Sequence, residues 1–158
     1  MINEESVDKA CTTVGKYTDE EIAAEFDRFF RAQPALCEFV VEITHESGQD
    51  IQELSLFLSY MIFKTLEAAD LKPEVLRPED IEAAYQKTES WMNRVNLIQN
   101  TEMEESIART ISEETEPNLL QYVIAELNEP ADDGAVLSDE EKGEVFFVLK
   151  TVITSLCK

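Results

Sequence analysis

The sequence predicts an all-α protein, and three observations lead to that fold class. Only 4 Gly and 5 Pro occur in 158 residues, whereas folds with many strands need more turn residues than this. Apolar residues recur at intervals of three and four, which places them on one face of a helix. Ser or Thr precedes several of these stretches with Glu three positions later, a helix-start signal. We expect a single-domain bundle of about seven helices, with stacked helical pairs as an alternative arrangement.

The first two helices are expected to follow a polar N-terminal segment. Residues 1–16 show no clear apolar periodicity, so we expect a flexible tail there and a helical domain over 17–158. Thr18 and Glu21 form a capping box that begins the first helix. Pro34 suits the first turn of the second helix, and Gly48 is a suitable residue to end it.

The next two helices differ in how much of their circumference is apolar. Residues 50–69 are apolar on nearly all sides, so this helix is expected to be the central one. Residues 71–78 contain two prolines and predict a connection, after which Pro78 begins a strongly amphipathic helix. The stripe of that helix is Ile81, Tyr85, Thr88, Met92 and Val95.

Three further helices complete the expected bundle. Thr101 and Glu104 form a second capping box, and its helix has a narrow apolar line that favours an outer position. Pro117 begins the next helix, and Ser138 with Glu141 forms a third capping box for the last one. The expected buried positions of the final two helices are Leu119, Leu120, Val123, Ile124, Leu127, Val145, Val148, Leu149, Val152 and Leu156.

The formal net charge of −21 excludes several classes of partner. Direct nucleic-acid binding and binding to anionic membranes both require basic surfaces, so neither is expected. No secretory signal precedes residue 20 and no apolar run spans a bilayer, which favours a cytoplasmic protein. The three cysteines are too few and too scattered for a disulfide framework or a zinc site, and no cofactor is expected.

Two short patterns resemble metal sites in part. Glu42 and His45 have the Glu-x-x-His spacing of carboxylate di-iron bundles, but the chain has one histidine and the pair falls on the helix face away from the apolar stripe. The loop from Glu129 to Glu140 places Gly134 and Asp133 as a calcium loop would. Its first position is Glu129 instead of the usual Asp, and its third is Ala131, which has no side-chain oxygen. Neither pattern therefore predicts a metal site.

The acidic residues suggest a different function, mimicry of DNA. Glutamates on a rigid helical body can imitate phosphate spacing and occupy a basic nucleic-acid-binding protein. The candidates are Glu102, Glu104, Glu105, Glu113, Glu114 and Glu116, most of which should face solvent. Ordinary solubilising charge explains the same residues, so mimicry stays the least favoured alternative.

The leading hypothesis is a non-catalytic interaction module that binds another protein or itself. The last helix has a second apolar strip of Phe146, Phe147 and Ile153, which either meets a second chain or wedges the helix inside the fold. The alternative is a protein, with enzymes included, that binds a small ligand or metal in a pocket lined by Tyr60, Tyr85 and Trp91. The sequence contains no phosphate loop, nucleophile elbow or His/Cys pair, which favours a non-catalytic protein over an enzyme.

Overall fold

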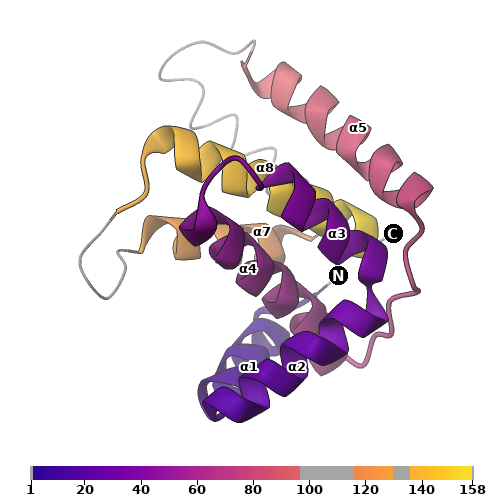
Figure 1. Ribbon diagram of the computed structural model, residues 1–158, viewed down its shortest axis with the longest axis vertical. Helices are drawn as coiled ribbons and strands as arrows, with labels where there is room; N and C mark the ends of the chain where they lie inside the picture. Colours follow the sequence, from indigo (N-terminus) through magenta and orange to yellow (C-terminus); the bar gives the residue numbers. More distant parts are fainter. Residues whose placement is uncertain (1, 97–115, 130–135, 158) are drawn as a thin grey trace.

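The computed structural model describes residues 2–96, 116–129 and 136–157, and these residues contain seven helices and no strand (Figure 1). The all-α fold class is therefore confirmed. The helices are α1 (Glu4–Gly15), α2 (Asp19–Ala32), α3 (Pro34–Ile43), α4 (Gln49–Ala68), α5 (Pro78–Asn96), α7 (Pro117–Asn128) and α8 (Asp139–Leu156). The helix expected after Thr101 lies outside the described residues.

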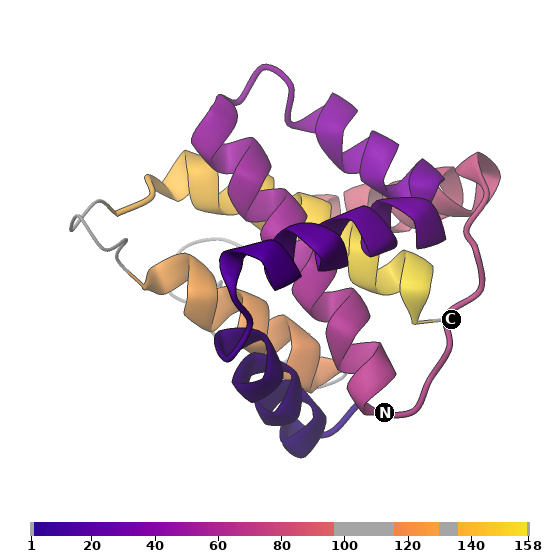
Figure 2. The same cartoon turned by 60° about the horizontal axis from the view of Figure 1, so that its bottom comes forward.

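Helices α4 and α8 form the centre of the bundle. α4 packs on α1, α2, α3 and α8, while α8 packs on α3, α4, α5 and α7. Figure 2 shows α4 running through the middle of the molecule, with α1 and α7 together on one side. The central position expected for residues 50–69 agrees with this arrangement. The consecutive pairs α2–α3, α3–α4 and α7–α8 pack on each other, whereas α1 packs mainly on α4 and α7.

The N-terminal segment forms a packed helix where the sequence predicted a flexible tail over residues 1–16. Asn3 caps α1 by accepting a hydrogen bond from the backbone N–H of Ser6 at 2.9 Å. Val7, Ala10 and Val14 are buried against the core, and Ile2 is 1% exposed. The prediction was wrong because Val7, Ala10 and Val14 do recur at helical spacing, and this stripe was missed because its side chains are small. These small side chains are enough to hold α1 in place, because the helix packs against both α4 and α7.

Helix boundaries follow the local signals in most places. Both capping boxes within the described residues are present, at Thr18 with Glu21 and at Ser138 with Glu141. α3 is an exception, since it ends at Ile43 instead of reaching Gly48. Gly48 instead precedes α4 with a φ of 98°, a conformation that favours glycine.

The C-terminal end of α4 turns into the connection to α5 through a Schellman motif. The N–H of Leu71 donates to the carbonyl of Leu66 at 2.9 Å, and the N–H of Asp70 donates to that of Glu67 at 3.0 Å. Asp70 has a φ of 58°, the left-handed conformation that this motif needs at its C′ position. Residues 71–77 then lead across the surface to Pro78, where α5 begins.

Within the described ranges, none of the helices combines the length and the apolar composition needed to cross a bilayer.

Candidate functional site

Glu42 and His45, the two side chains considered as di-iron ligands, both face solvent. Glu42 and His45 are both exposed, and because α3 ends at Ile43, His45 lies in the turn after the helix. In the described part of the chain, no three His, Cys, Asp or Glu side chains are arranged to hold a metal ion. The exposure of the pair agrees with the outward orientation expected from the sequence.

The acidic candidates are only partly described. Asp133 lies outside the described residues, and Glu140 is exposed in the first turn of α8, where a negative charge interacts favourably with the helix dipole. Glu116 was counted among the acids of a DNA-like surface, but its residue is only 8% exposed. Its Oε2 accepts a hydrogen bond from the backbone N–H of Ile2 at 2.6 Å, so this carboxylate holds the N-terminal segment against α7.

The cysteines have the properties of buried thiols. Burial raises the pKa of Cys37 to about 12, and burial together with the charge of Glu116 raises that of Cys157 to about 12. Burial is also the main cause that raises the pKa of Cys11. A nucleophilic cysteine needs a depressed pKa, so none of the three is suited to covalent catalysis.

The three aromatic residues considered as one pocket lie in three separate places. Tyr60 packs against rings of α2, and its hydroxyl donates to Glu25 at 3.0 Å. Tyr85 lies between Phe39 and a ring of α8, at centroid distances of 6.3 and 5.2 Å. Of the three, Trp91 lines a cavity described below. The predicted common pocket is therefore wrong. Tyr60 packs where α4 meets α2, whereas Tyr85 and Trp91 pack where α5 meets α8.

The second apolar strip of α8 is covered by α5 of the same chain. The ring of Phe146 lies 5.8 Å from that of Trp91, and the ring of Phe147 lies 5.2 Å from that of Tyr85. Ile153 is 4% exposed. The contacts with α5 favour the alternative in which this helix is wedged within the fold. The rings of Phe146 and Phe147 are half-buried and keep part of their surface exposed, and Ile153 lines the cavity described next.

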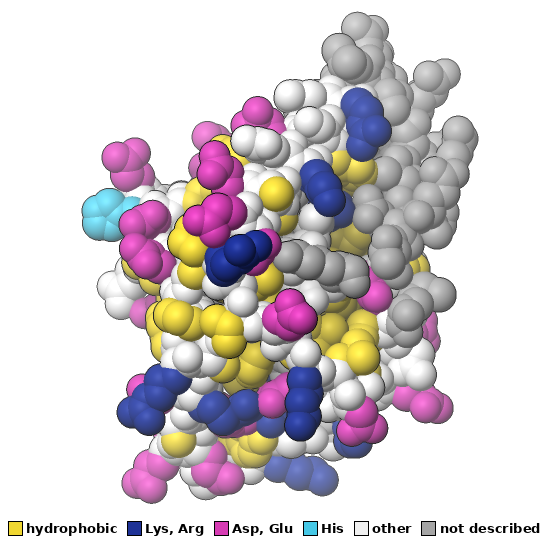
Figure 3. Space-filling model, turned by 90° about the vertical axis from the view of Figure 1, so that its right-hand side faces the viewer, with side chains coloured by type: hydrophobic (Ala, Val, Ile, Leu, Met, Phe, Trp, Pro, Cys, Tyr) yellow, Lys and Arg dark blue, Asp and Glu magenta, His cyan; other side chains and the backbone are white. Residues whose placement is uncertain are grey.

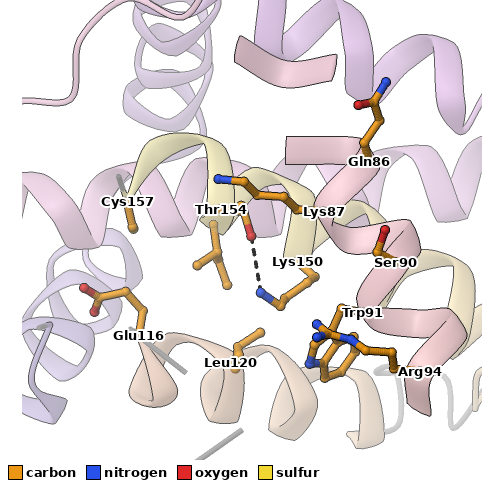
Figure 4. A pocket seen from close by; sticks show the side chains of 11 residues that line it. Gln86, Lys87, Ser90, Trp91, Arg94, Glu116, Leu120, Lys150, Thr154 and Cys157 are labelled. Carbon is orange, nitrogen blue, oxygen red and sulfur yellow. Dashed lines mark hydrogen bonds between the residues drawn. The ribbon is translucent and has the colours of Figure 1, made fainter. Parts of the chain in front are cut away.

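A cavity of about 740 Å³ opens between α5, α8 and the start of α7 (Figure 4). The helix α5 contributes Lys87, Trp91 and Arg94 at intervals of four and three, which places them on one face. Lys150 and Thr154 face them from α8. The remaining lining residues are Gln86, Ser90, Glu116, Leu120, Ile153 and Cys157.

Basic side chains and one indole N–H give this cavity its electrostatic character. Lys150 is 7% exposed, its Nζ lies 5.7 Å from the centre of the Trp91 ring and donates to Oγ1 of Thr154 at 3.3 Å. Trp91 is 6% exposed, and its buried Nε1–H has no hydrogen-bond partner in the described structure. Buried N–H groups are nearly always paired, so this donor favours a hydrogen-bond acceptor at the site.

A second cavity of about 540 Å³ adjoins the first, because Glu116 and Cys157 line both. It lies between the ends of α4 and α8 and the connection 71–77. Two of its lining side chains, Leu71 and Val75, are 49% and 66% exposed, among the most exposed large apolar residues in the described structure. The two cavities together form a groove, which we call the α5–α8 groove.

The face on the right of Figure 1 brings basic and apolar surface together. Figure 3 shows Lys and Arg side chains beside hydrophobic side chains on this face. Asp and Glu side chains lie among them, so the basic character belongs to the described lining of the first cavity and not to the whole face. In the sequence, the lining residues on α5 and those on α8 each recur at helical spacing. Neither pattern alone shows that these two helix faces lie opposite each other.

Comparison with protein-family models, with curated proteins and with solved structures finds no match to this chain.

Proposed function

We propose that the protein is a non-catalytic interaction module that binds a segment of another protein in the α5–α8 groove. The observation that carries this proposal is the exposure of Leu71 and Val75 at a cavity that continues into the one beside Trp91. Apolar side chains exposed beside a groove and rimmed by polar groups are typical of interaction surfaces.

The size of the groove supports a peptide segment over a compact small molecule. The two cavities, of about 740 and 540 Å³, together exceed the roughly 300–1,000 Å³ of ordinary small-ligand pockets. The first cavity alone falls within that range, so a small ligand is the second candidate. An extended peptide uses both cavities at once.

The groove side chains favour binding over catalysis. The thiol in the groove is that of Cys157, whose pKa is raised to about 12 by burial and by Glu116. His45, the only histidine of the chain, lines neither cavity. Lys, Arg, Trp and Leu side chains can bind and orient a partner without a nucleophile and base pair.

A displayed library of short random peptides tests this proposal. We expect selection on the wild-type protein to enrich peptides that lose binding to Leu71→Ser and Val75→Ser. Val136→Ser is the matched control, because Val136 is 62% exposed and lines neither cavity. Peptides that bind all four proteins equally, or no enrichment at all, would contradict the proposal.

Native mass spectrometry of the purified protein separates this proposal from its alternatives. A monomer without added mass is expected. A dimer that Val75→Ser dissociates would show that the occupant is a second copy of the chain. A small molecule that remains bound, and that Trp91→Phe releases, would favour the small-ligand alternative.

A further inference from the structure

We infer that the α5–α8 groove recognises an acidic peptide segment, with a side-chain carboxylate of the partner held between Lys87 and Arg94 at Trp91 Nε1. This inference rests on the proposed function and names the chemistry of its partner. It is carried by the side chains on the two walls of the first cavity (Figure 4).

Arg94 differs in its pairing from the other described arginines. Arg28, Arg31 and Arg77 each form an ion pair with a carboxylate at 2.6 to 3.4 Å. In the described part of the chain, Arg94 forms no ion pair. Lys87, about two turns earlier on α5, likewise has no carboxylate partner among the described residues. Both side chains are exposed at the cavity rim and can meet an incoming anion.

The indole N–H of Trp91 supplies the second, independent observation. Its Nε1 is buried, has no partner in the described structure and belongs to a ring that lines the cavity. Figure 4 shows this ring reaching from α5 into the space between α5 and α8. A carboxylate can accept from an indole N–H and from basic side chains together, because its two oxygens offer about four lone-pair sites.

The net charge of the chain opposes an acidic partner, but the opposing field is screened. At physiological salt the Debye length is about 8 Å, so distant exposed acids contribute little inside the cavity. Among the described residues, Glu116 is the acid that lines the first cavity, and it accepts from the N–H of Ile2, whereas Glu74 and Asp80 line the second cavity beside Lys72. We therefore expect the carboxylate in the first cavity, where the described lining residues are Lys87, Arg94 and Lys150 against Glu116.

The apolar wall limits what kind of anion fits. Leu120 and Ile153 line the same cavity, and Leu71 and Val75 follow in the second. A partner segment with Asp or Glu next to aliphatic residues matches this order of surfaces. A nucleic acid does not match, because its other phosphates would face a strongly acidic protein.

The peptide selection tests the inference when it is repeated on charge variants. We expect Asp and Glu to be enriched among peptides selected on the wild-type protein and not among those selected on Lys87→Gln/Arg94→Gln. Arg31→Gln is the control, because Arg31 is 80% exposed and lies away from the groove on α2. Peptides that need Val75 but show no enrichment of acids would overturn this inference and leave the proposed function standing. An absence of any selected peptide contradicts the proposed function itself.

Fluorescence of Trp91, the single tryptophan of the chain, reports directly on the site. The probes are a selected acidic peptide, its counterpart with Gln and Asn in place of Glu and Asp, and free glutarate. We expect the acidic peptide to change the emission and to bind about tenfold tighter than its neutral counterpart, as one charge-assisted contact predicts. Equal affinities would overturn the inference, and so would glutarate that binds as tightly as the peptide, since it would indicate a small-anion site.

Calorimetry on Trp91→Phe separates hydrogen bonding from ring packing. This variant keeps an aromatic ring and removes the N–H donor. We expect it to weaken the acidic peptide more than the neutral counterpart. An equal loss for both peptides would show that Trp91 contributes only apolar contact and would remove it from the inferred site.

Discussion

The α2–α4 contact and the α5–α8 groove both place basic side chains next to aromatic rings, but they differ in what those bases are paired with. Between α2 and α4, Glu25 accepts hydrogen bonds from Arg28 at 2.6 Å, Lys64 at 2.7 Å and Tyr60 at 3.0 Å. Arg28 also forms a two-bond contact with Glu67, at 2.6 and 2.8 Å. Every charge in this network has an opposite charge within the fold.

The groove contains the same residue types without the matching carboxylates. Lys87 and Arg94 line a cavity and have no ion pair in the described part of the chain, and Trp91 has a buried unpartnered N–H. Paired charges hold two helices together, whereas charges that face a cavity can be satisfied by another molecule. The difference therefore separates a structural network from a candidate binding site, which composition alone cannot do.

The largest expected effect concerns the aromatic layer beneath the α2–α4 network. Phe29 is 0% exposed, and its ring lies 5.1 Å from that of Phe63 and 6.0 Å from that of Tyr60. We expect Phe29→Ala to lower the free energy of unfolding by about 3–5 kcal/mol. Its neighbour Phe30 is 38% exposed, so Phe30→Ala should cost less than about 1 kcal/mol.

Chemical denaturation followed by circular dichroism measures both changes. Similar losses for the two variants would mean that α2 is not held to α4 through the Phe29 face, and the description of this contact would be wrong.

The second prediction removes the carboxylate at the centre of the network. Glu25→Gln should lower the free energy of unfolding by about 1.5–3 kcal/mol, since it weakens the hydrogen bonds from Arg28 and Lys64. Glu38→Gln is the control, because Glu38 is exposed on α3. A loss no larger than that of the control would show that the network contributes nothing measurable.

The pH dependence of this difference follows from the pKa of Glu25. The hydrogen bond from Arg28 is the largest cause that lowers this pKa, with Lys64 and Tyr60 adding to it against partial burial, from 4.5 to about 2. A carboxylate with a depressed folded-state pKa stabilises the fold above its ordinary pKa and loses that effect as the pH falls. The stability gap between wild type and Glu25→Gln should therefore shrink between pH 4.5 and about 2. A gap that stays constant over this range would contradict the lowered pKa.

The third prediction concerns the turn through which the chain passes from one region to the other. Asp70 adopts a φ of 58° at the end of α4, and the connection that follows lines the second cavity. Glycine adopts this left-handed conformation without the steric cost that an L-residue has, which stabilises the folded state. It also has more conformational freedom in the unfolded chain, which offsets part of that gain. The net effect expected for Asp70→Gly is a stabilisation of about 0.5 kcal/mol. Thermal unfolding against Asp50→Gly, a substitution in the first turn of α4, measures the effect. A destabilised Asp70→Gly would show that the Asp side chain contributes more than its backbone strain costs.

Local signals in the sequence predict the helices well, and contacts distant along the chain explain what they miss. Pro34, Pro78 and Pro117 each begin a helix where expected, and the described capping boxes are formed. α1 was missed because its buried face consists of small residues. Its packing depends on α4 and α7, which no local pattern in the first residues can show.

The candidate site was less predictable than the fold for a related reason. Lys87 and Arg94 look like solvated positions of an amphipathic helix, and Lys150 looks like an interruption of an apolar stripe. They become one site because α5 packs on α8, whose sequence lies far from that of α5. Tyr60 and Tyr85 fit a ligand pocket equally well by pattern, yet the structure places each in a separate aromatic cluster.

The smallest expected effect is the one that completes the comparison. Lys87→Gln and Arg94→Gln should each change the free energy of unfolding by less than about 0.5 kcal/mol, because both side chains are exposed and form no ion pair in the described structure. Chemical denaturation beside Glu25→Gln measures this, with Arg31→Gln as a basic residue outside the groove. If either groove variant lost as much stability as Glu25→Gln, its cation would hold the fold together as Arg28 does, and its place in the groove would have a structural explanation. A neutral result instead means that Lys87 and Arg94 are free of any structural role, so a loss of peptide binding in these variants can be attributed to the groove itself.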